Sequence, residues 1–276
     1  MSCILLEMSR RDHLIQVFIV SSVVLYFLYL IFISFLARLF KVQFNPHIYR
    51  KVKELDSKAE IILKDNFTFY KNLSSTKRKY FNHRVGVFIS NYTFHGKEGL
   101  EITSEMKVLI AGNFTLLTFG MADFKPKVFD KIILYPHSYL STNSGLLYKG
   151  EFNPKMRSIV FSWSDFMSGL QITNDNLNLG LHEFTHVLQY QSKLSQSPSY
   201  IIFDDMVDEI NTFLEKNDNK MKIINSNFLR NYAFTNDYEF LAVLVEHFFE
   251  SPKDFKFQFP KLYSYVKKMI NYKELH

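Results

Sequence analysis

The stretch "NLGLHEFTHVLQYQ" (residues 178–191) decides how the rest of the chain is interpreted. It holds two histidines, His182 and His186, four residues apart, with Glu183 directly after the first. Imidazoles one helical turn apart project side by side, so both can bind one metal ion, and Glu183 would lie beside a water molecule on that ion. The same residues can also be ordinary polar side chains on a helix. A third ligand is needed to distinguish the two interpretations.

One face of this stretch is apolar and repeats at helical spacing: Leu177, Leu181, Phe184 and Leu188. We predict a helix whose apolar stripe packs on the core of a domain. Asp175 or Asn176 is suited to cap the start of the helix, because a short polar side chain accepts hydrogen bonds from the first free backbone amides.

The best source of a third ligand is "NYAFTNDYEFLAVLVEHFFES" (residues 231–251). Residues 238–249 are apolar almost all round, which predicts a buried helix. Glu239 and Glu246 lie inside it, seven residues apart and therefore on one face. A buried carboxylate without a partner costs several kcal/mol, so each needs a cation or strong donors. A metal ion would meet that need for one of them; lysines or backbone donors are the alternative.

The composition indicates a globular protein with a substantial core: 276 residues, 47% hydrophobic and 17% aromatic. The net charge of +6 suits a domain held beside an anionic membrane. The basic cluster at residues 77–79 ("KRK") is interpreted as a solvated helix face, and no nucleic-acid partner is expected. The single cysteine, Cys3, excludes an intramolecular disulfide and a zinc site built from several cysteines.

One uncharged, mostly apolar run, "HLIQVFIVSSVVLYFLYLIFISFLA" (residues 13–37), stands near the start of the chain. A helix of about 20 apolar residues crosses the hydrocarbon core of a bilayer. After a short segment 1–13, we therefore predict a single transmembrane helix over residues 14–37 in contact with lipid. A signal peptide, cleaved or retained, is the alternative, although aromatic residues crowd its cleavage region. More Lys and Arg follow the run than precede it, which favours a cytoplasmic C-terminal domain.

Residues 38–64 form the connector, and the polar stretch "RKVKELDSKAEIILKDN" (residues 50–66) is predicted as helical. After it, helical spacing predicts helices over residues 75–90 and from Thr103 or Ser104 to Gly120. Residues 131–140 ("KIILYPHSYL") and 155–163 ("KMRSIVFSW") are predicted as strands, joined by a turn-rich linker. The fold class is therefore α+β, with a mostly helical domain over residues 65–276 that carries a small sheet.

These motifs together resemble the Mlc titration factor A (MtfA)-like family of zinc-dependent metallopeptidases, and locally the catalytic domain of anthrax lethal factor. The family pattern is an H-E-F-x-H helix, then a tyrosine seven residues before a metal-binding glutamate in an "EFFA"-like helix. This chain has "HEFTH" at residues 182–186, Tyr232, and Glu239 in "EFLA". Further matches are "GLEITSEMKVLIAGNFTLL", "KIILYPHSYL", "IVFSWSDFMSG" and "AVLVEHFFESP", so the resemblance covers about residues 65–270.

The resemblance implies a zincin-like peptidase domain with one Zn²⁺ per chain, held by His182, His186 and Glu239. Glu183 would be the general base and Tyr232 would stabilise the oxyanion, with a peptide or protein as substrate. Cleavage could be internal or aminopeptidase-like.

Glu246 is then a structural acid or orients a ligand histidine. Gln189 departs from the family, which usually has an aspartate at that position.

Two other functions stay open. The family includes proteins that sequester a transcriptional regulator, so the domain could act by binding, with little or no proteolysis. A metal could also have a purely structural role, with a fourth side chain closing its coordination. For the peptidase, we expect residues 157–162 to form an exposed strand edge that holds substrate by strand addition. An internal strand is the alternative.

Overall fold

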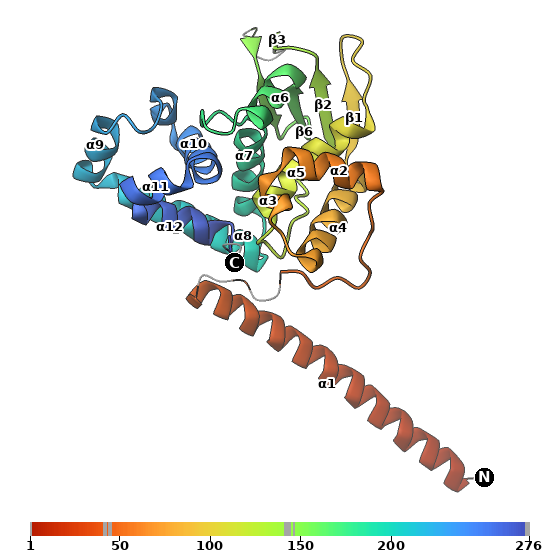
Figure 1. Ribbon diagram of the computed structural model, residues 1–276. Coiled ribbons are helices and arrows are strands. Elements are labelled where there is room, and N and C mark those ends of the chain that lie inside the picture. Colours follow the sequence, from red (N-terminus) through yellow and green to blue (C-terminus); the bar gives the residue numbers. More distant parts are fainter. Residues whose placement is uncertain (1, 41–42, 44–45, 141–144, 146, 274–276) are drawn as a thin grey trace. The chain divides into compact units, whose positions relative to one another are not determined.

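The computed structural model describes residues 2–40, 43, 46–140, 145 and 147–273. The chain forms two compact units, Met1–Val42 and Gln43–His276. The first unit contains the helix α1 (Ser2–Phe40), and the second contains all the other helices and strands (Figure 1).

Helix α1 contains a long, mostly apolar segment of 27 residues, Arg10–Leu36. At 1.5 Å per residue a helix of this length exceeds the ~30 Å hydrocarbon core of a bilayer. Two of its serine hydroxyls donate hydrogen bonds within the helix: Ser22 to the carbonyl of Phe18 and Ser34 to that of Leu30. Within the described part of the chain, this is the one helix long and apolar enough to cross a membrane, a property that signal sequences share.

The second unit contains a four-stranded mixed sheet in the order β1-β2-β6-β5. Its strands are β1 (Thr93–Gly96), β2 (Lys131–Tyr135), β6 (Ser158–Ser162) and β5 (Gly150–Asn153). The first three are parallel to one another, and β5 pairs with β6 in the antiparallel direction. A separate two-stranded ladder joins β3 (Tyr139–Leu140) and β4 (Leu147–Tyr148).

The prediction that residues 157–162 form an exposed edge is wrong. Strand β6 pairs with β2 on one side and with β5 on the other, and all five of its residues are buried. Its run of Ile159, Val160 and Phe161 is typical of a strand covered on both faces. The sheet edge on this side is β5.

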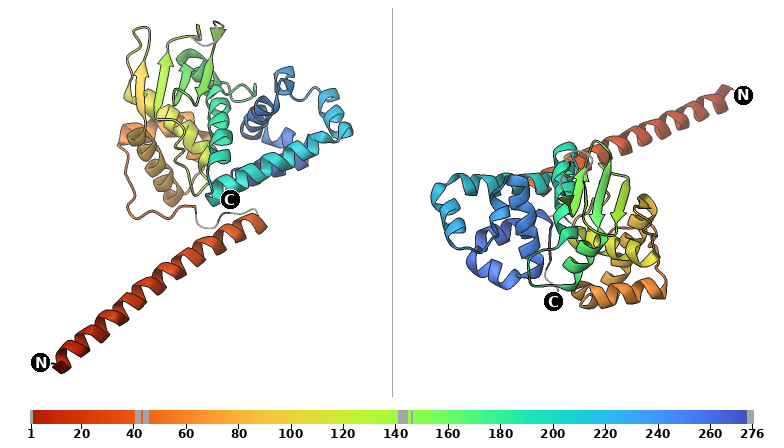
Figure 2. Two further views of the ribbon diagram at one scale, coloured as in Figure 1. Left: turned by 180° about the vertical axis from the view of Figure 1, so that it is seen from behind. Right: turned by 90° about the horizontal axis from the view of Figure 1, so that it is seen from above.

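The first group of helices in this unit is α2 (Ser57–Asn66), α3 (Thr68–Lys71), α4 (Ser75–Asn91), α5 (Ser104–Thr118) and α6 (Trp163–Gln171). The second group is α7 (Leu179–Leu194), α8 (Pro198–Glu215), α9 (Asn217–Asn225), the short 3-10 helix η1 (Asn231–Phe234), α10 (Asp237–Glu250), α11 (Pro252–Gln258) and α12 (Pro260–Met269). Helix α7 is central: it packs against α5 and β5, and also against α8 and α10. Figures 1 and 2 show α2–α5 beside the sheet and α9–α12 on the opposite side of α7.

Most of the predicted elements are confirmed. Helices α4 and α5 match the two predicted helices, and the Thr103 hydroxyl caps α5 by accepting from the amide of Met106 at 3.2 Å. Strands β2 and β6 lie inside the predicted strands. The turn-rich linker between them contains β4 and β5, which were not predicted; residues 141–144 and 146 of it lie outside the described residues.

The helical part of the predicted connector packs into the second unit as α2. Ala59 and Leu63 are buried, and α2 contacts α5. This follows from the spacing of its apolar residues, which places Ala59 and Leu63 one turn apart on one face.

Candidate metal centre

Asn178 caps helix α7. Its backbone is extended and its Oδ1 accepts a hydrogen bond from the amide of Leu181 at 3.0 Å. The prediction of Asp175 or Asn176 as the cap is wrong: Asn176 has a left-handed φ of 56°, and Asp175 instead accepts from the amide of Leu177 in the turn before the helix.

The predicted apolar stripe of α7 is confirmed except at its first member. Leu181, Phe184 and Leu188 are buried in the core. Leu177 is 52% exposed, because it precedes the first helical residue and does not share the helical face. The stripe therefore fixes the rotation of α7, and the histidines project from a neighbouring face toward α10.

Helix α10 begins after Asn236, whose side-chain oxygen accepts from the amides of Tyr238 and Glu239. Glu239 therefore stands in the first turn, and Glu246 follows two turns later on the same face. Ala242 lies between them and is fully buried, so α7 and α10 can approach closely.

The structure brings together His182, His186 and Glu239. Oε2 of Glu239 lies 2.9 Å from Nε2 of His182 and 3.6 Å from Nε2 of His186. One ligand atom from each of the three lies within 4.8 Å of the others. Two imidazole nitrogens and one carboxylate oxygen suit zinc with an open position for water, so the donor set fits a metal ion. No other such group of three occurs among the described residues.

The electrostatics of this cluster favour a positive charge. Burial alone would raise the pKa of Glu239, but hydrogen bonds with His182 and His186 outweigh it and hold that pKa below its ordinary value. Burial alone would lower the pKa of His182, but Glu239 and Glu246 raise it to about 10. A metal ion at Nε2 of His182 would compete with a proton for that nitrogen.

Glu183 is buried between α7 and the edge strand β5. Burial raises the pKa of its carboxyl, and the backbone of Phe152 in β5 forms a hydrogen bond with it. Gly150 permits this contact: a Cβ there would lie 2.9 Å from both Cγ and Oε1 of Glu183. The carboxyl group is therefore held against the outer side of β5.

Tyr232 lies in η1, and its ring centroid is 6.0 Å from that of His182. The side chain is half-exposed. Burial, followed by the charge of Glu239, raises the pKa of the hydroxyl. The hydroxyl therefore keeps its proton and can act as a hydrogen-bond donor at the mouth of the site.

Glu246 is almost fully buried, and its two oxygens face different partners. Oε1 lies 3.3 Å from Nδ1 of His182, and Oε2 lies 2.6 Å from Nη1 of Arg230. Sequence reasoning identified the carboxylate but missed Arg230. The available signal was the need of a buried carboxylate for a cation, with Arg230 two residues before Tyr232.

Gln189 stands one turn after His186 and is buried. Within the described part of the chain, its Oε1 and the Nδ1 of His186 both lack a hydrogen-bond partner. An aspartate at this position could accept a hydrogen bond from Nδ1 of His186 and would bring a negative charge to it. Gln189 brings no such charge.

Two cavities flank the cluster along β5. One of about 510 Å³ is lined by Gly150, His182, Glu183 and Tyr232, among others. The other, of about 310 Å³, is lined by Phe152, His186 and Glu239, among others. Because β5 contributes to both cavities, an extended chain lying beside this strand would pass over the cluster.

A mostly helical domain with a small mixed sheet and a His-His-Glu group on two packed helices defines a metallopeptidase-like protein. The chain belongs to the glucose-regulated metallo-peptidase M90 family, whose model matches residues 45–271. The resemblance found from the motifs is thereby confirmed.

Two relatives are similar to this chain. The uncharacterized protein slr2042 of Synechocystis sp. (strain ATCC 27184 / PCC 6803 / Kazusa) is 23% identical over 228 residues, covering 76% of this chain and 82% of the relative. Mlc titration factor A of Serratia proteamaculans (strain 568) is 26% identical over 184 residues, covering 61% of this chain and 70% of the relative.

Proposed function

We propose that the protein is a membrane-anchored, zinc-dependent peptidase in which His182, His186 and Glu239 hold one Zn²⁺ per chain. The observation that carries the proposal is the convergence of three ligand atoms within 4.8 Å in a domain of a metallo-peptidase family. Zinc is the metal expected for two imidazoles and one carboxylate.

When bound, zinc supplies a Lewis acid that polarises the substrate carbonyl and lowers the pKa of water toward 7. Glu183 accepts the proton of the attacking water and returns it to the leaving amine. Burial raises the pKa of Glu183, so the carboxyl can hold that proton between the two steps. The Tyr232 hydroxyl donates a hydrogen bond to the oxygen on which negative charge develops.

A peptide substrate would lie along β5, because β6, the strand expected from the sequence to hold substrate, is internal. The outer side of β5 faces Glu183, and its residues line both cavities beside the cluster. Backbone hydrogen bonds to a sheet edge hold an extended peptide with little dependence on its sequence. This arrangement suits either internal cleavage or aminopeptidase-like trimming.

Membrane anchoring would come from Arg10–Leu36 as a single span. The excess of Lys and Arg after the span supports a cytoplasmic position for the peptidase domain. Resistance of the full chain to alkaline carbonate extraction tests the anchor, and release by carbonate would contradict it.

A second candidate function is binding of a transcriptional regulator with little or no proteolysis. The observation in its favour is the name of one relative, Mlc titration factor A. A regulator-binding domain could retain the metal for stability alone, so bound zinc by itself does not distinguish the two functions.

The distinguishing experiment measures bound zinc and hydrolysis of a peptide panel, with free and blocked N-termini, for the full chain. The variants are Glu183→Gln, which keeps the ligands, and Glu239→Ala, which removes one. We expect wild type to bind zinc and cleave, Glu183→Gln to bind zinc without cleaving, and Glu239→Ala to do neither. Zinc binding by wild type without cleavage would favour the regulator-binding function. Full activity of Glu183→Gln would contradict the proposed mechanism.

A further inference from the structure

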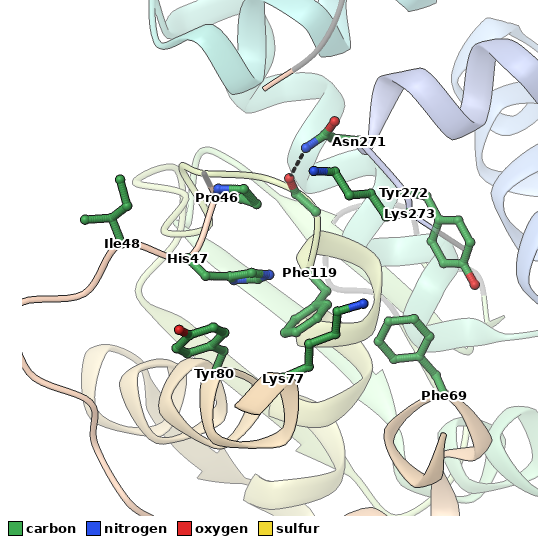
Figure 3. A pocket seen from close by; sticks show the side chains of 11 residues that line it. Pro46, His47, Ile48, Phe69, Lys77, Tyr80, Phe119, Asn271, Tyr272 and Lys273 are labelled. Atoms are coloured by element: carbon green, nitrogen blue, oxygen red, sulfur yellow. Dashed lines mark hydrogen bonds between the residues drawn. The ribbon is translucent and has the colours of Figure 1, made fainter. Parts of the chain in front are cut away.

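A cavity of about 360 Å³ in the second unit shares none of its described lining residues with the metal centre (Figure 3). Its walls are largely aromatic. Phe69 packs edge-on against Phe119 and also contacts Tyr272, while the His47 ring stacks on Tyr80. An apolar or planar part of a ligand could therefore lie against these rings.

Two lysines give this aromatic cavity a positive charge. Lys77 comes from α4 and Lys273 from the chain that follows α12, and both line the cavity. Figure 3 shows the Lys77 side chain beside the Phe119 ring and the Lys273 side chain beside Asn271. None of the described residues that line the cavity is acidic, and among the described residues neither lysine has a carboxylate partner within 4.0 Å. The charge and the walls together suit an amphipathic anion.

The chain enters the second unit beside this cavity. Gln43 is buried, and its Oε1 accepts from the amide of Ala122 and the hydroxyl of Ser199. Asn271, which lines the cavity, donates to the carbonyl of Gln43 at 3.4 Å and to that of Gly120 at 2.6 Å. The Asn271 side chain therefore both lines the cavity and contacts Gln43, where the chain enters the second unit.

Arg84 holds the next segment in place. This buried guanidinium donates to the carbonyl of Pro46 at 2.9 Å, to the hydroxyl of Tyr49 at 2.6 Å and to the carbonyl of Thr118 at 2.6 Å. Pro46, His47 and Ile48 form one wall of the cavity. The cavity is therefore a built feature of the second unit, with its N-terminal wall tied to α4 and α5.

The chain enters the second unit three residues after α1. Helix α1 ends at Phe40, and Gln43 is already docked in the second unit. Three peptide steps span at most about 11 Å, so Gln43 stays close in space to the end of the proposed membrane helix whatever the arrangement of the two units. A phospholipid brings an anionic phosphate and an apolar body to this location.

We propose that this cavity binds an anionic phospholipid of the bilayer that holds α1. The phosphate lies between the ammonium groups of Lys77 and Lys273, and the adjoining apolar part of the lipid lies against Phe69 and Phe119. The inference rests on the proposed membrane anchoring. It gives the second unit a lipid-dependent contact with the membrane in addition to the covalent one.

The test uses the full chain in nanodiscs that contain phosphatidylcholine and phosphatidylglycerol. Native mass spectrometry after transfer to a non-ionic detergent counts the lipids retained per chain. We expect one phosphatidylglycerol per chain, and about thirty-fold weaker retention for the double variant Lys77→Gln/Lys273→Gln, since each cation contributes about a factor of five. The matched control Arg50→Gln/Lys51→Gln removes the same charge at two exposed residues outside the cavity, and should retain the lipid.

Several outcomes would overturn the inference. Equal retention of phosphatidylcholine would show that the phosphate charge is not recognised, and an equal loss in the control variant would show unspecific attraction. Displacement of the lipid by inorganic phosphate alone would identify a soluble anion as the ligand. A chain that resists carbonate extraction but retains no phosphatidylglycerol would contradict this inference and leave membrane anchoring intact. Extraction by carbonate would contradict both.

Discussion

Nη1 of Arg230 lies 2.6 Å from Oε2 of Glu246, a side chain that is 2% exposed. The other oxygen of the same carboxylate faces Nδ1 of His182, whose Nε2 faces Glu239. Arg230 also donates to the carbonyl of Asn176, in the loop before α7. A series of paired side chains therefore connects the candidate metal ligand His182 to Arg230, a residue outside both helices that carry the ligands.

The first prediction concerns Glu246. In Glu246→Gln the hydrogen bond to His182 loses its negative charge, so the imidazole becomes less basic and less firmly oriented. We expect zinc affinity to fall by about 10- to 100-fold, measured by competition with a chromophoric chelator. The exposed Glu215→Gln is the matched control and should leave affinity unchanged. Unchanged affinity in Glu246→Gln would exclude an orienting role.

The second prediction concerns Arg230. Arg230→Met removes the guanidinium that faces Oε2 of the buried Glu246, and we expect the free energy of unfolding to fall by about 3 kcal/mol. The double variant Arg230→Met/Glu246→Gln should recover part of that loss. Lys193→Gln breaks a partly exposed ion pair with Asp204 and should cost no more than about 1 kcal/mol. Denaturant unfolding measures all three, and equal effects of Arg230→Met and Lys193→Gln would contradict the account.

The third prediction concerns Gly150. In Gly150→Ala the new methyl group would meet Leu179 at 2.8 Å and the Glu183 side chain at 2.9 Å, so β5 or Glu183 must move. We expect peptide hydrolysis to fall by at least about tenfold, because a displaced general base loses much of its contribution. Gly99→Ala is the control: it strains a backbone with φ 78° but meets no atom within 4 Å. It should lower stability by about 1 kcal/mol and leave kcat unchanged.

The fourth prediction concerns pH and two neighbouring groups on α10. Burial, and then the charge of Arg230, lowers the pKa of His247 to about 4. Burial raises the pKa of Glu250 to about 7, with Asp175 and Glu246 contributing and Asn178 opposing. Between pH 4.5 and 6.5, His247 is protonated in the unfolded state but neutral in the folded state. In the same range, Glu250 is protonated in the folded state but ionised in the unfolded state. The two contributions to stability therefore oppose each other in this window.

Single substitutions should separate the two contributions. In wild type, His247 lowers stability progressively as pH falls from 6.5 toward 4, because only the unfolded state takes up its proton. His247→Gln removes this loss and leaves the contribution of Glu250, so the stability of the variant should rise on acidification toward pH 4.5. In wild type, Glu250 contributes stability at low pH, and this contribution is lost as pH rises from 4.5 through 7. Glu250→Gln removes it and leaves only the contribution of His247, so this variant should lose stability on acidification. Each proton changes the slope of the free energy of unfolding against pH by at most about 1.4 kcal/mol per pH unit. Denaturant unfolding across this range measures the slopes, and slopes that match wild type in both variants would contradict the prediction.

Sequence reasoning predicted the elements whose pattern is local and periodic. The repeat of Leu181, Phe184 and Leu188 identifies α7, and the buried Glu239 in an apolar helix identifies α10. We predicted that α7 and α10 meet at a metal ion because a buried glutamate on α10 needs a cation. The choice of Glu239 over Glu246 came from the family resemblance, because spacing alone treats the two alike.

The rest depends on contacts between residues distant in sequence. Strand β5 has four residues in a turn-rich linker, too short for an alternation of burial to be recognised. Its pairing with β6 is what turned the expected edge into an internal strand. The contact between Arg230 and Glu246 depends on how η1 packs against α10, and the capping role of Asn178 depends on a backbone dihedral angle. Neither property has a local pattern in the sequence.

The central claim is that His182, His186 and Glu239 together hold one zinc ion and leave a position open. Anomalous diffraction at the zinc edge, from crystals of the zinc-loaded full chain, tests it most directly. The account predicts one anomalous peak per chain, bounded by Nε2 of His182, Nε2 of His186 and the carboxylate of Glu239, with no fourth protein ligand. A peak elsewhere in the chain, or a fourth side chain closing the coordination, would contradict it.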